Sequence, residues 1–432
     1  MFLPLYRFAT RRSAPLLERI LRNRLEGGKE HPDRWQEKKA VITKSRPDGP
    51  LLWLHAASVG ESVSALILID HLLASYPSLH ILVTTGTRTS AELMSKRLPE
   101  RAFHQFAPLD HPEWVAGFIK HWAPNAAIWM ESELWPNMLQ ALREAEIPTA
   151  LVNARLSKKS YYMWSTAPVC AKKTLSTFKK ILCQSAEDKQ KFQKLRASNV
   201  IETGNIKYSA APLPHDENEF NQLNALLSDR PVWLYASTHA GEEALALRIH
   251  DRLKNSYPDL ITILVPRHPE RGEEIEQLLQ NSGMKIVRRT EQKHPPSADT
   301  NIYIADTLGE LGLFYRLSPI AMIGRSLSDD GGGGHNPIEA AQLNCAVLHG
   351  PNVQYQTELY SAMARENAAI KVQDRTELFQ TLNRLLQDDK LLSDQQKNAQ
   401  RFAKERSKII DRVLSELRDL FDEALSVGES GA

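Results

Sequence analysis

A segment that occurs twice in the chain constrains its fold more than any other feature. Residues 51–86 read LLWLHAASVGESVSALILIDHLLASYPSLHILVTTG, and residues 232–268 read VWLYASTHAGEEALALRIHDRLKNSYPDLITILVPRH. Each copy has an apolar run, a short loop of small residues, a helical pattern ended by Tyr-Pro, and a second apolar run. The spacing from the loop glycine to the proline is the same in both copies. We interpret this repeat as a βαβ unit used twice, each copy opening a doubly wound domain.

Further apolar runs of the kind expected for strands buried on both faces alternate with helical patterns. They are AAIWM, TALVN and KILCQ in the first half of the chain, and KIVRR, IYIAD, AMIGR and CAVLHG in the second. The sequence therefore predicts an α/β protein with two Rossmann-like doubly wound domains facing each other across a cleft, which is the GT-B architecture. Because epimerases also use this architecture, the fold alone does not fix the chemistry.

The length of 432 residues is sufficient for two domains, each with its own core. A segment rich in proline and polar residues, which begins at Tyr208, separates the two halves. We expect residues 1–40 to form a basic amphipathic membrane-associating arm, 41–207 a first Rossmann-like domain, 208–225 a linker, 226–392 a second Rossmann-like domain, and 393–432 a C-terminal helix and tail.

The N-terminal arm combines basic and apolar residues. Its first 25 residues contain six arginines, opposed only by Glu18, and aromatic and aliphatic residues lie between them. This pattern suits the surface of an anionic membrane, although a helix packed on the domain with its arginines in water is the alternative. No stretch of the sequence approaches the roughly 18 apolar residues of a membrane-spanning helix. The arginines also interrupt the continuous apolar stretch that a signal peptide needs.

Overall composition excludes several other classes of protein. The formal net charge of +2 gives no indication of a nucleic-acid partner. The three cysteines are widely spaced and form no Cys-x-x-Cys pair, which argues against a disulfide framework or a structural zinc site and fits a reducing cytosol. No His-x-x-x-His or Asp-x-Asp arrangement suggests a catalytic metal, so we expect neither a metal nor another cofactor.

Ligands of open α/β sheets lie beyond the carboxyl ends of the strands, so the loops after the apolar runs are the places to look for a site. In the first half, Glu61 lies at a helix start after LLWLH, Glu131 follows AAIWM, and Lys207 precedes the linker. A carboxylate in the first turn of a helix is also favoured by the helix dipole alone, and Lys207 could be a solvated hinge residue.

The second half offers a site for an anion. Its loop Ser237-Thr238-His239-Ala240-Gly241-Glu242 has hydroxyls and backbone N–H groups at a helix start, and Arg267 follows the next strand. A run of glycines, residues 331–334, then leads into His-Asn-Pro-Ile-Glu and could let the backbone approach a phosphate. Neither a P-loop nor a dinucleotide fingerprint is present.

Eight segments of the chain, in order, are HAASVGES, MESELWPN, NARLS, GNIKYS, STHAGEE, VPRHPER, ADTLGELGLFY and GGGHNPIEAA. Taken together these segments closely resemble the 3-deoxy-D-manno-octulosonic acid (Kdo) transferase family of lipid A and lipopolysaccharide assembly, which implies that residues 41–207 form the acceptor domain and 226–392 the CMP-Kdo-binding domain. The resemblance implies an inverting glycosyltransferase, associated with the cytoplasmic face of the cell inner membrane, that transfers Kdo from CMP-Kdo to the lipid A precursor lipid IVA. It implies no metal and no nucleic-acid partner.

The resemblance also implies roles for individual residues. Glu61 looks like the general base, and Glu131 and Lys207 match residues taken to stabilise the transition state. Segments that match the CMP-contacting ones contain Pro266, Arg267, Gly309, Glu310, Leu311, Asn336, Pro337, Ile338 and Glu339, and secondary candidates for the donor site are Ser237, Thr238, His239, Gly241 and Glu242.

Two other functions fit the same fold. The first is a GT-B epimerase, which would convert a nucleotide sugar without any lipid acceptor. The second is a non-catalytic, nucleotide-binding membrane adaptor, for which carboxylates at positions 61 and 131 would be unnecessary. The chain also departs from many family members, because its N-terminal arm is short and arginine-rich rather than plainly hydrophobic.

Overall fold

A computed structural model describes residues 2–227, 230–292, 296–328 and 331–425 of the chain. The chain forms two compact units. Unit 1 contains the residues up to Ala210 together with those from Ser407 onward, and unit 2 is the continuous segment Ala211–Arg406. The C-terminal segment therefore completes the core of the first unit and not that of the second.

Unit 1 is built on a parallel sheet of seven strands. In spatial order these are β3 (Ala102–Phe106), β2 (His80–Thr85), β1 (Leu51–His55), β4 (Ala126–Met130), β5 (Thr149–Ala154), β6 (Phe178–Cys183) and β7 (Val200–Glu202). Strand order reverses between β1 and β4, which lie side by side with Leu52 opposite Ala126. This reversal is the topological switch point, where ligands of such sheets bind.

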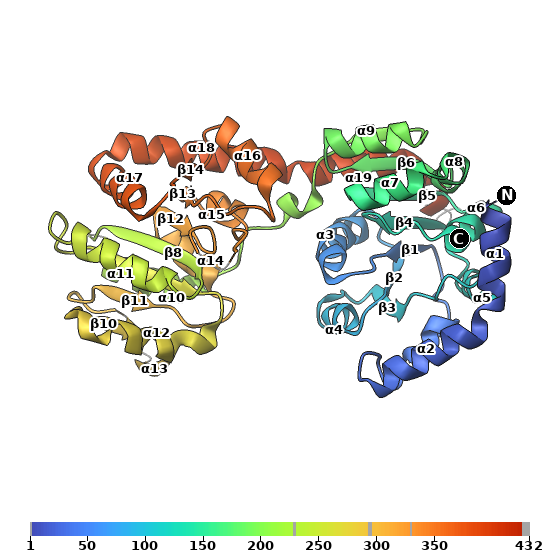
Figure 1. Cartoon of the computed structure of the whole chain (residues 1–432), viewed down its shortest axis with the longest axis horizontal. Helices are drawn as coiled ribbons and strands as arrows, with labels where there is room; N and C mark the ends of the chain where they lie inside the picture. The colour runs from blue at the N-terminus through green and yellow to red at the C-terminus, as the bar shows by residue number, and fades with distance from the viewer. Residues whose placement is uncertain (1, 228–229, 293–295, 329–330, 426–432) are drawn as a thin grey trace. The chain divides into compact units, whose positions relative to one another are not determined.

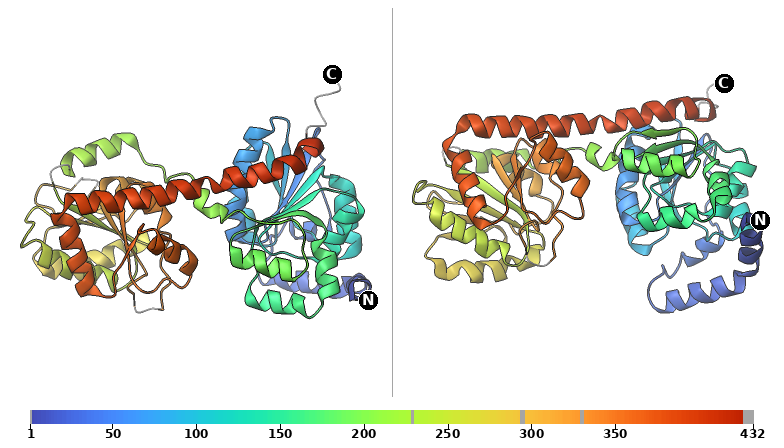
Figure 2. Two further views of the ribbon diagram at one scale, coloured as in Figure 1. Left: turned by 90° about the horizontal axis from the view of Figure 1, so that it is seen from above. Right: turned by 45° about the horizontal axis from the view of Figure 1, so that its top comes forward.

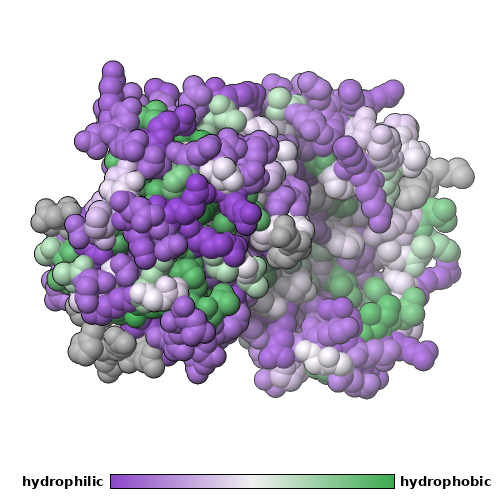
Figure 3. Space-filling view, turned by 60° about the vertical axis from the view of Figure 1, so that its left-hand side comes forward, coloured by the Kyte–Doolittle hydropathy of each residue, from purple (hydrophilic) through white to green (hydrophobic). Residues whose placement is uncertain are grey.

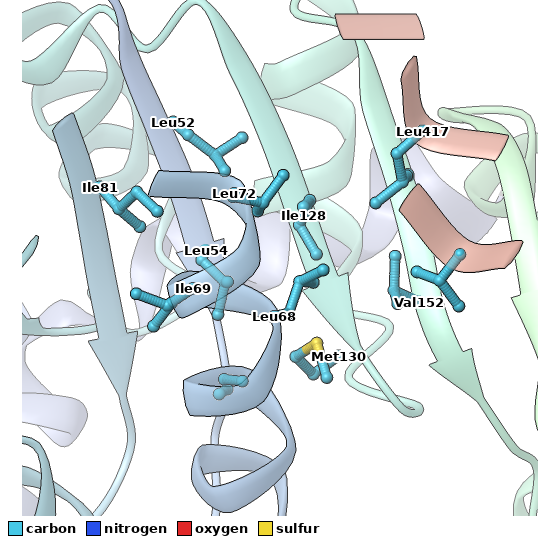
Figure 4. Close-up of a cluster of buried hydrophobic side chains, with 14 of the residues drawn as sticks. Leu52, Leu54, Leu68, Ile69, Leu72, Ile81, Ile128, Met130, Val152 and Leu417 are labelled. Carbon is cyan, nitrogen blue, oxygen red and sulfur yellow. The ribbon is translucent and has the colours of Figure 1, made fainter. Parts of the chain in front are cut away.

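Helices cover both faces of this sheet (Figure 1). They are α3 (Val59–Ser75), α4 (Arg88–Arg97), α5 (Pro112–Trp122), α6 (Pro136–Glu144), α7 (Lys158–Ser165), α8 (Pro168–Leu175), α9 (Ala186–Lys194) and α19 (Ile409–Leu425), with the 3₁₀ turns η1 (Trp35–Lys39) and η2 (Ile206–Ser209). Alternate residues of β1 serve the two faces, since Leu52 and Leu54 join one core and Leu51 and Trp53 the other. In the first of these cores, side chains of β1, β2, β4 and β5 meet those of α3 and α19 (Figure 4).

The last helix, α19, belongs to unit 1 although more than 180 residues separate it from the rest of that unit. Its apolar stripe, which includes Val413, Leu417 and Phe421, is buried in the core beside α3. At its start, the backbone N–H of Ile410 donates to the hydroxyl of Ser209 at 3.1 Å. Figure 2 shows this helix, in red, lying along unit 1.

Unit 2 repeats the architecture with a second parallel sheet. Its strands, in spatial order, are β10 (Ile286–Arg288), β11 (Ile302–Ile304), β9 (Ile261–Pro266), β8 (Val232–Thr238), β12 (Ile320–Ile323), β13 (Ala346–His349) and β14 (Ile370–Lys371). Its helices are α10 (Glu217–Leu227), α11 (Glu242–Leu253), α12 (Gly272–Leu279), α13 (Arg289–Gln292), α14 (Leu311–Leu317), α15 (Ile338–Gln342), α16 (Thr357–Arg365), α17 (Arg375–Gln387) and α18 (Asp389–Ser407), with η3 (Pro269–Arg271) and η4 (Gln280–Ser282). On the face drawn in Figure 3, hydrophilic side chains predominate and hydrophobic ones form scattered groups.

The two repeat copies are the central βαβ units of the two sheets, β1–α3–β2 and β8–α11–β9. All the apolar runs that the sequence analysis assigned to strands are strands, and the predicted pair of Rossmann-like doubly wound domains is confirmed. The predicted linker region, residues 208–225, contains the end of η2 and most of α10, and residues 393–432 include most of α18 and all of α19.

The N-terminal arm forms two helices, α1 (Phe2–Arg12) and α2 (Ala14–Glu26). One side of the arm packs on unit 1, because Leu3 is buried in its core and the hydroxyl of Tyr6 donates to Asp110 at 3.0 Å. The other side leaves large apolar side chains in water; these are Leu5, Phe8, Leu16 and Ile20. Among the helices of the described residues, none is both long and apolar enough to cross a bilayer.

Candidate active site

Glu61 lies at the switch point of unit 1, where β1 leads into α3. Ser58 caps α3, since its hydroxyl accepts from the N–H of Glu61 at 3.3 Å and donates to the Glu61 carboxylate at 2.8 Å. The other carboxylate oxygen accepts from the N–H of Ala57 at 2.9 Å. The Ser-x-x-Glu spacing of a capping box thus fixes the rotamer of Glu61.

Burial changes the acidity of this carboxyl. Only 7% of Glu61 is exposed, and desolvation raises its pKa to about 7, against the lowering effect of the hydrogen bonds from Ser58 and Ala57. The negative charges of Glu133 and Glu131 raise the pKa further. A carboxylate with a pKa near neutrality can accept a proton at physiological pH and release it again.

The loop after β4 brings two more carboxylates to the same edge. Glu131 adopts the left-handed backbone conformation, with φ of 55°, which is uncommon for a residue other than glycine. Its carboxylate binds Nζ of Lys207 at 3.1 Å. Glu133 is held by Trp135, whose indole N–H donates at 2.6 Å, and burial raises the pKa of Glu133.

Lys207 reaches this edge from η2, which follows β7. A Cβ placed on Gly60 would lie 3.7 Å from Lys207 Nζ, so the ammonium group lies beside the residue that precedes Glu61. The structure therefore gathers Glu61, Glu131 and Lys207, three candidates separated by up to 146 positions in the sequence, at one switch point. Glu133, the second carboxylate of the MESELWPN motif, was not among the predicted site residues.

In unit 2, the loop after β8 has an unusual backbone. Ser237 has φ of 59° and Gly241 has φ of 93°, and both values lie in the left-handed region. Glu242 points inward and is buried; its carboxylate accepts from the N–H groups of His239 and Arg325, both at 2.9 Å. Glu242 therefore joins the loops after β8 and β12, and the equally buried Thr238 donates to Glu243 at 2.9 Å.

Cationic and imidazole side chains gather at the same edge of unit 2. The Nε2 atoms of His239 and His335 lie 3.0 Å apart, and their rings stack. Burial lowers the pKa of His335 to about 4, and the charges of His239, Arg267 and Arg325 lower it further. Arg267 is exposed and follows Pro266, the buried last residue of β9. The positive charges of Arg267 and Arg325 at this edge favour an anionic ligand.

Two glycines of the run 331–334 lie directly against other parts of the protein. A Cβ on Gly332 would collide with the carbonyl of Arg325, and one on Gly333 would collide with the ring of Tyr355. These glycines thus let the loop fold against the end of β12. Beyond them, the amide of Asn336 accepts from the N–H of Ile338 after Pro337 and donates to Glu339, both at 3.1 Å. Burial raises the pKa of Glu339.

A small cavity of about 170 Å³ lies beside the loop after β11. Gly309, Glu310 and the segment from Pro214 to Asp216 line it, and Leu311 begins α14 next to it. The carboxylate of Glu310 is engaged by Arg289 through two hydrogen bonds of 2.6 Å, which lower the pKa of Glu310. In the part of the chain that the structure describes, no three His, Cys, Asp or Glu side chains are grouped to hold a metal ion.

Known proteins resemble this chain in sequence and in fold. Residues 33–210 match the family described as 3-Deoxy-D-manno-octulosonic-acid transferase (kdotransferase). The 3-deoxy-D-manno-octulosonic acid transferase of Rickettsia bellii is 35% identical over 422 residues, which cover 96% of this chain and 99% of the relative. The protein of the same name from Rickettsia felis is 36% identical over 367 residues, which cover 84% of this chain and 78% of the relative.

A solved structure shares the fold at low identity. The glycosyltransferase from Rickettsia africae superimposes with a TM-score of 0.55 at 13% identity, covering 87% of this chain and 99% of its own. That likeness concerns the fold alone, whereas the sequence similarity to the Rickettsia transferases shows the family. The transferase is thereby favoured over the epimerase and the non-catalytic adaptor. The chain belongs to the 3-deoxy-D-manno-octulosonic acid transferase family and is a glycosyltransferase with the GT-B fold.

Proposed function

We propose that this enzyme transfers Kdo from CMP-Kdo to the lipid A precursor lipid IVA with inversion at the anomeric carbon. Unit 1 binds the acceptor and supplies Glu61 as the general base, and unit 2 binds the donor. The observation that carries the proposal is the position of Glu61, a buried carboxyl with a raised pKa at the switch point of unit 1, beside Glu131 and Lys207. The names of the sequence relatives support Kdo as the sugar.

In the proposed reaction, Glu61 accepts the proton of the acceptor hydroxyl as its oxygen attacks the anomeric carbon of Kdo. The bond from that carbon to the phosphate oxygen breaks on the opposite face, and CMP leaves with the bonding electrons. Lys207 offsets negative charge on the sugar carboxylate or on the departing phosphate, and Glu131 orients Lys207 through their 3.1 Å ion pair. A positioned base contributes about 10²–10⁴-fold to such a rate.

Apolar side chains around Glu61 support a lipid acceptor. Val59 and Val63 on α3 are 40% and 44% exposed, and Trp135 after the Glu133 loop is 42% exposed. Exposed apolar groups beside a polar site suit a substrate with a sugar headgroup and acyl chains. In unit 2, Arg267 and the imidazoles near it suit the phosphate of the donor, and the cavity beside Gly309 suits the cytosine ring of the donor.

The variant Glu61→Gln tests this assignment. We expect its rate of transfer from CMP-Kdo to tetraacylated lipid A precursor to fall at least about 100-fold, because the amide cannot accept a proton. CMP binding by calorimetry should be unchanged. The matched control Glu187→Gln removes an exposed first-turn carboxylate from α9 and should leave transfer intact. Near wild-type transfer by Glu61→Gln, read by mass spectrometry, would remove Glu61 from its role.

We further propose that the arm of α1 and α2 rests on the cytoplasmic surface of the inner membrane. Its exposed Leu5, Phe8, Leu16 and Ile20 enter the headgroup region while its arginines meet anionic lipid. The full chain should then sediment with vesicles that contain phosphatidylglycerol. The double variant Leu5→Ser/Phe8→Ser should sediment less, whereas Leu226→Ser, an exposed leucine of α10, should not; equal sedimentation of all three would contradict the proposal.

A further inference from the structure

The short turn η2 that carries Lys207 is held by side-chain amides from neighbouring strands. The backbone N–H of Ile206, the first residue of η2, donates to the side-chain oxygen of Asn153 at 3.1 Å. The side-chain oxygen of Asn205 caps the turn by accepting from the N–H of Lys207 at 3.0 Å. Two successive N–H groups of the turn are thus fixed by amide oxygens, and one of these oxygens comes from β5.

Gln184, which follows β6, joins these amides into one network. Its side-chain N–H donates to the carbonyl of Asn153 at 2.9 Å, and its side-chain oxygen accepts from Asn205 at 3.2 Å. Asn153, Gln184 and Asn205 therefore connect the ends of β5 and β6 to the turn. A connected set of amides holds a backbone segment more rigidly than the same bonds made separately.

The position of Asn153 is unusual in two respects. It is fully buried, and its φ of 56° lies in the left-handed region, which asparagine tolerates better than most residues. Its side-chain NH₂ group has no hydrogen-bond partner among the described residues, so a buried donor is left unsatisfied. These costs occur on β5, the strand next to β4, and β4 leads into Glu131, the ion-pair partner of Lys207.

We propose that Asn153 is a positioning residue for the transfer reaction: by fixing η2 to the end of β5, it sets where the ammonium group of Lys207 lies against Glu131 and Gly60. This inference rests on the role proposed above for Lys207. The side chain of Lys207 is 36% exposed and long, so its own packing does not fix it, and the place of its backbone decides which atoms it reaches. A displacement of about 1 Å at such a group costs on the order of 10²-fold in rate.

Asn153→Gly tests the proposal, because glycine keeps the left-handed backbone and removes the amide side chain that accepts from Ile206. We expect kcat to fall at least about tenfold while the KM values for CMP-Kdo and the lipid acceptor change less than about threefold. The matched control is Asn199→Gly, since Asn199 has a similar φ of 51° but precedes β7 and donates to Lys179. Asn199→Gly should keep wild-type kcat.

A double-mutant cycle separates positioning from a loss of stability. If Asn153 acts through Lys207, the variant Asn153→Gly/Lys207→Met should transfer no more slowly than Lys207→Met, within about twofold. The proposal would be overturned if the two substitutions lowered the transfer rate independently, so that their fold-losses multiplied in the double variant. A wild-type kcat in Asn153→Gly would also overturn it. Absence of transfer by the wild-type chain would instead overturn the proposed function.

Gln184→Met provides a second variant in case Asn153→Gly does not fold. It removes both bonds of Gln184 while keeping a side chain of similar length, and it should lower kcat in the same direction by at least about threefold. Its effect too should vanish in the Lys207→Met background. Failure of both variants to fold would show that these amides serve stability and would overturn the inference.

Discussion

At the scale of single residues, Glu61 shows how opposing local forces set one acidity. Burial raises its pKa, whereas the hydrogen bonds from Ser58 and Ala57 lower it, and the balance lies at about 7. Because a base must be ionised to accept a proton, we expect kcat to rise with pH through about 7 and to level off above it. A pH profile of transfer measures this, and a profile that is flat between pH 5 and 8 would contradict it.

The same raised pKa makes a prediction about stability. Between about pH 4.5 and 7, folded Glu61 keeps a proton that the unfolded chain has lost, so the free energy of unfolding falls as pH rises through this window. Glu61→Gln cannot titrate. Its stability relative to wild type should therefore increase by about 1–3 kcal/mol between pH 4.5 and 8, as measured by urea denaturation. A difference that is independent of pH would show that the native carboxyl titrates normally.

Ser58 couples a structural role to a chemical one. Ser58→Ala removes the cap of α3 and also a hydrogen bond that lowers the pKa of Glu61. We expect a loss of about 1 kcal/mol in stability and a shift of the pH profile to higher pH. Thr87→Ala removes the cap of α4, which has no acidic residue in its first turn. It should lower the stability by a similar amount without shifting the pH profile of transfer. Equal shifts in the two variants would contradict the coupling.

The side chains that follow strands at the site could be predicted from the sequence, but the residues that hold them in position could not. Glu61 and Glu131 follow predicted apolar runs, and Lys207 was predicted from its place before the linker; the structure brings the three together because parallel strands share one carboxyl edge. Asn153 ended a run of the same kind, within the NARLS motif, yet its role depends on a backbone φ and on η2, 53 positions later. Neither is visible in a linear pattern.

At the scale of elements, the strands that could be predicted were those with continuous apolar runs. Three strands were not predicted: β3, because its AFHQF contains polar residues, and β7 and β14, because they have only three and two residues. The unit in which α19 packs could not be predicted either. Its apolar periodicity indicates a helix, but periodicity does not say which of two cores will bury it.

The position of α19 predicts which unit a core substitution will weaken. Leu417→Ala on α19 and Leu385→Ala on α17 each truncate a buried leucine, and each should cost about 2–5 kcal/mol. Leu417 lies in a core of unit 1, and Leu385 in the core of unit 2. Hydrogen exchange under native conditions should therefore show faster opening of β1 in the first variant and of β8 in the second. The opposite pattern would place α19 with unit 2.

At the scale of the whole molecule, the repeat predicted two domains of one architecture, and the structure has two seven-stranded parallel sheets. The units differ in how the chain builds them. Unit 2 is one continuous segment with its own core, whereas unit 1 needs residues from both ends of the chain. Unit 2 should therefore fold without the rest of the protein. Residues 1–210 should not fold alone, because without α19 the core around Ile128 would be exposed to water.

This difference gives a direct test of where the donor binds. Residues 211–406, produced alone, should bind CMP with a Kd within about threefold of the full chain and should transfer no sugar. Arg267→Ala in this fragment should weaken binding roughly tenfold, because one charged contact to phosphate is worth about 1.5 kcal/mol or more. Arg401→Ala, at an exposed position of α18, is the control and should bind as the parent fragment does. If a folded fragment bound no CMP in calorimetry, the donor would have to depend on groups from unit 1, because the carboxyl edge of unit 2 would then be insufficient by itself.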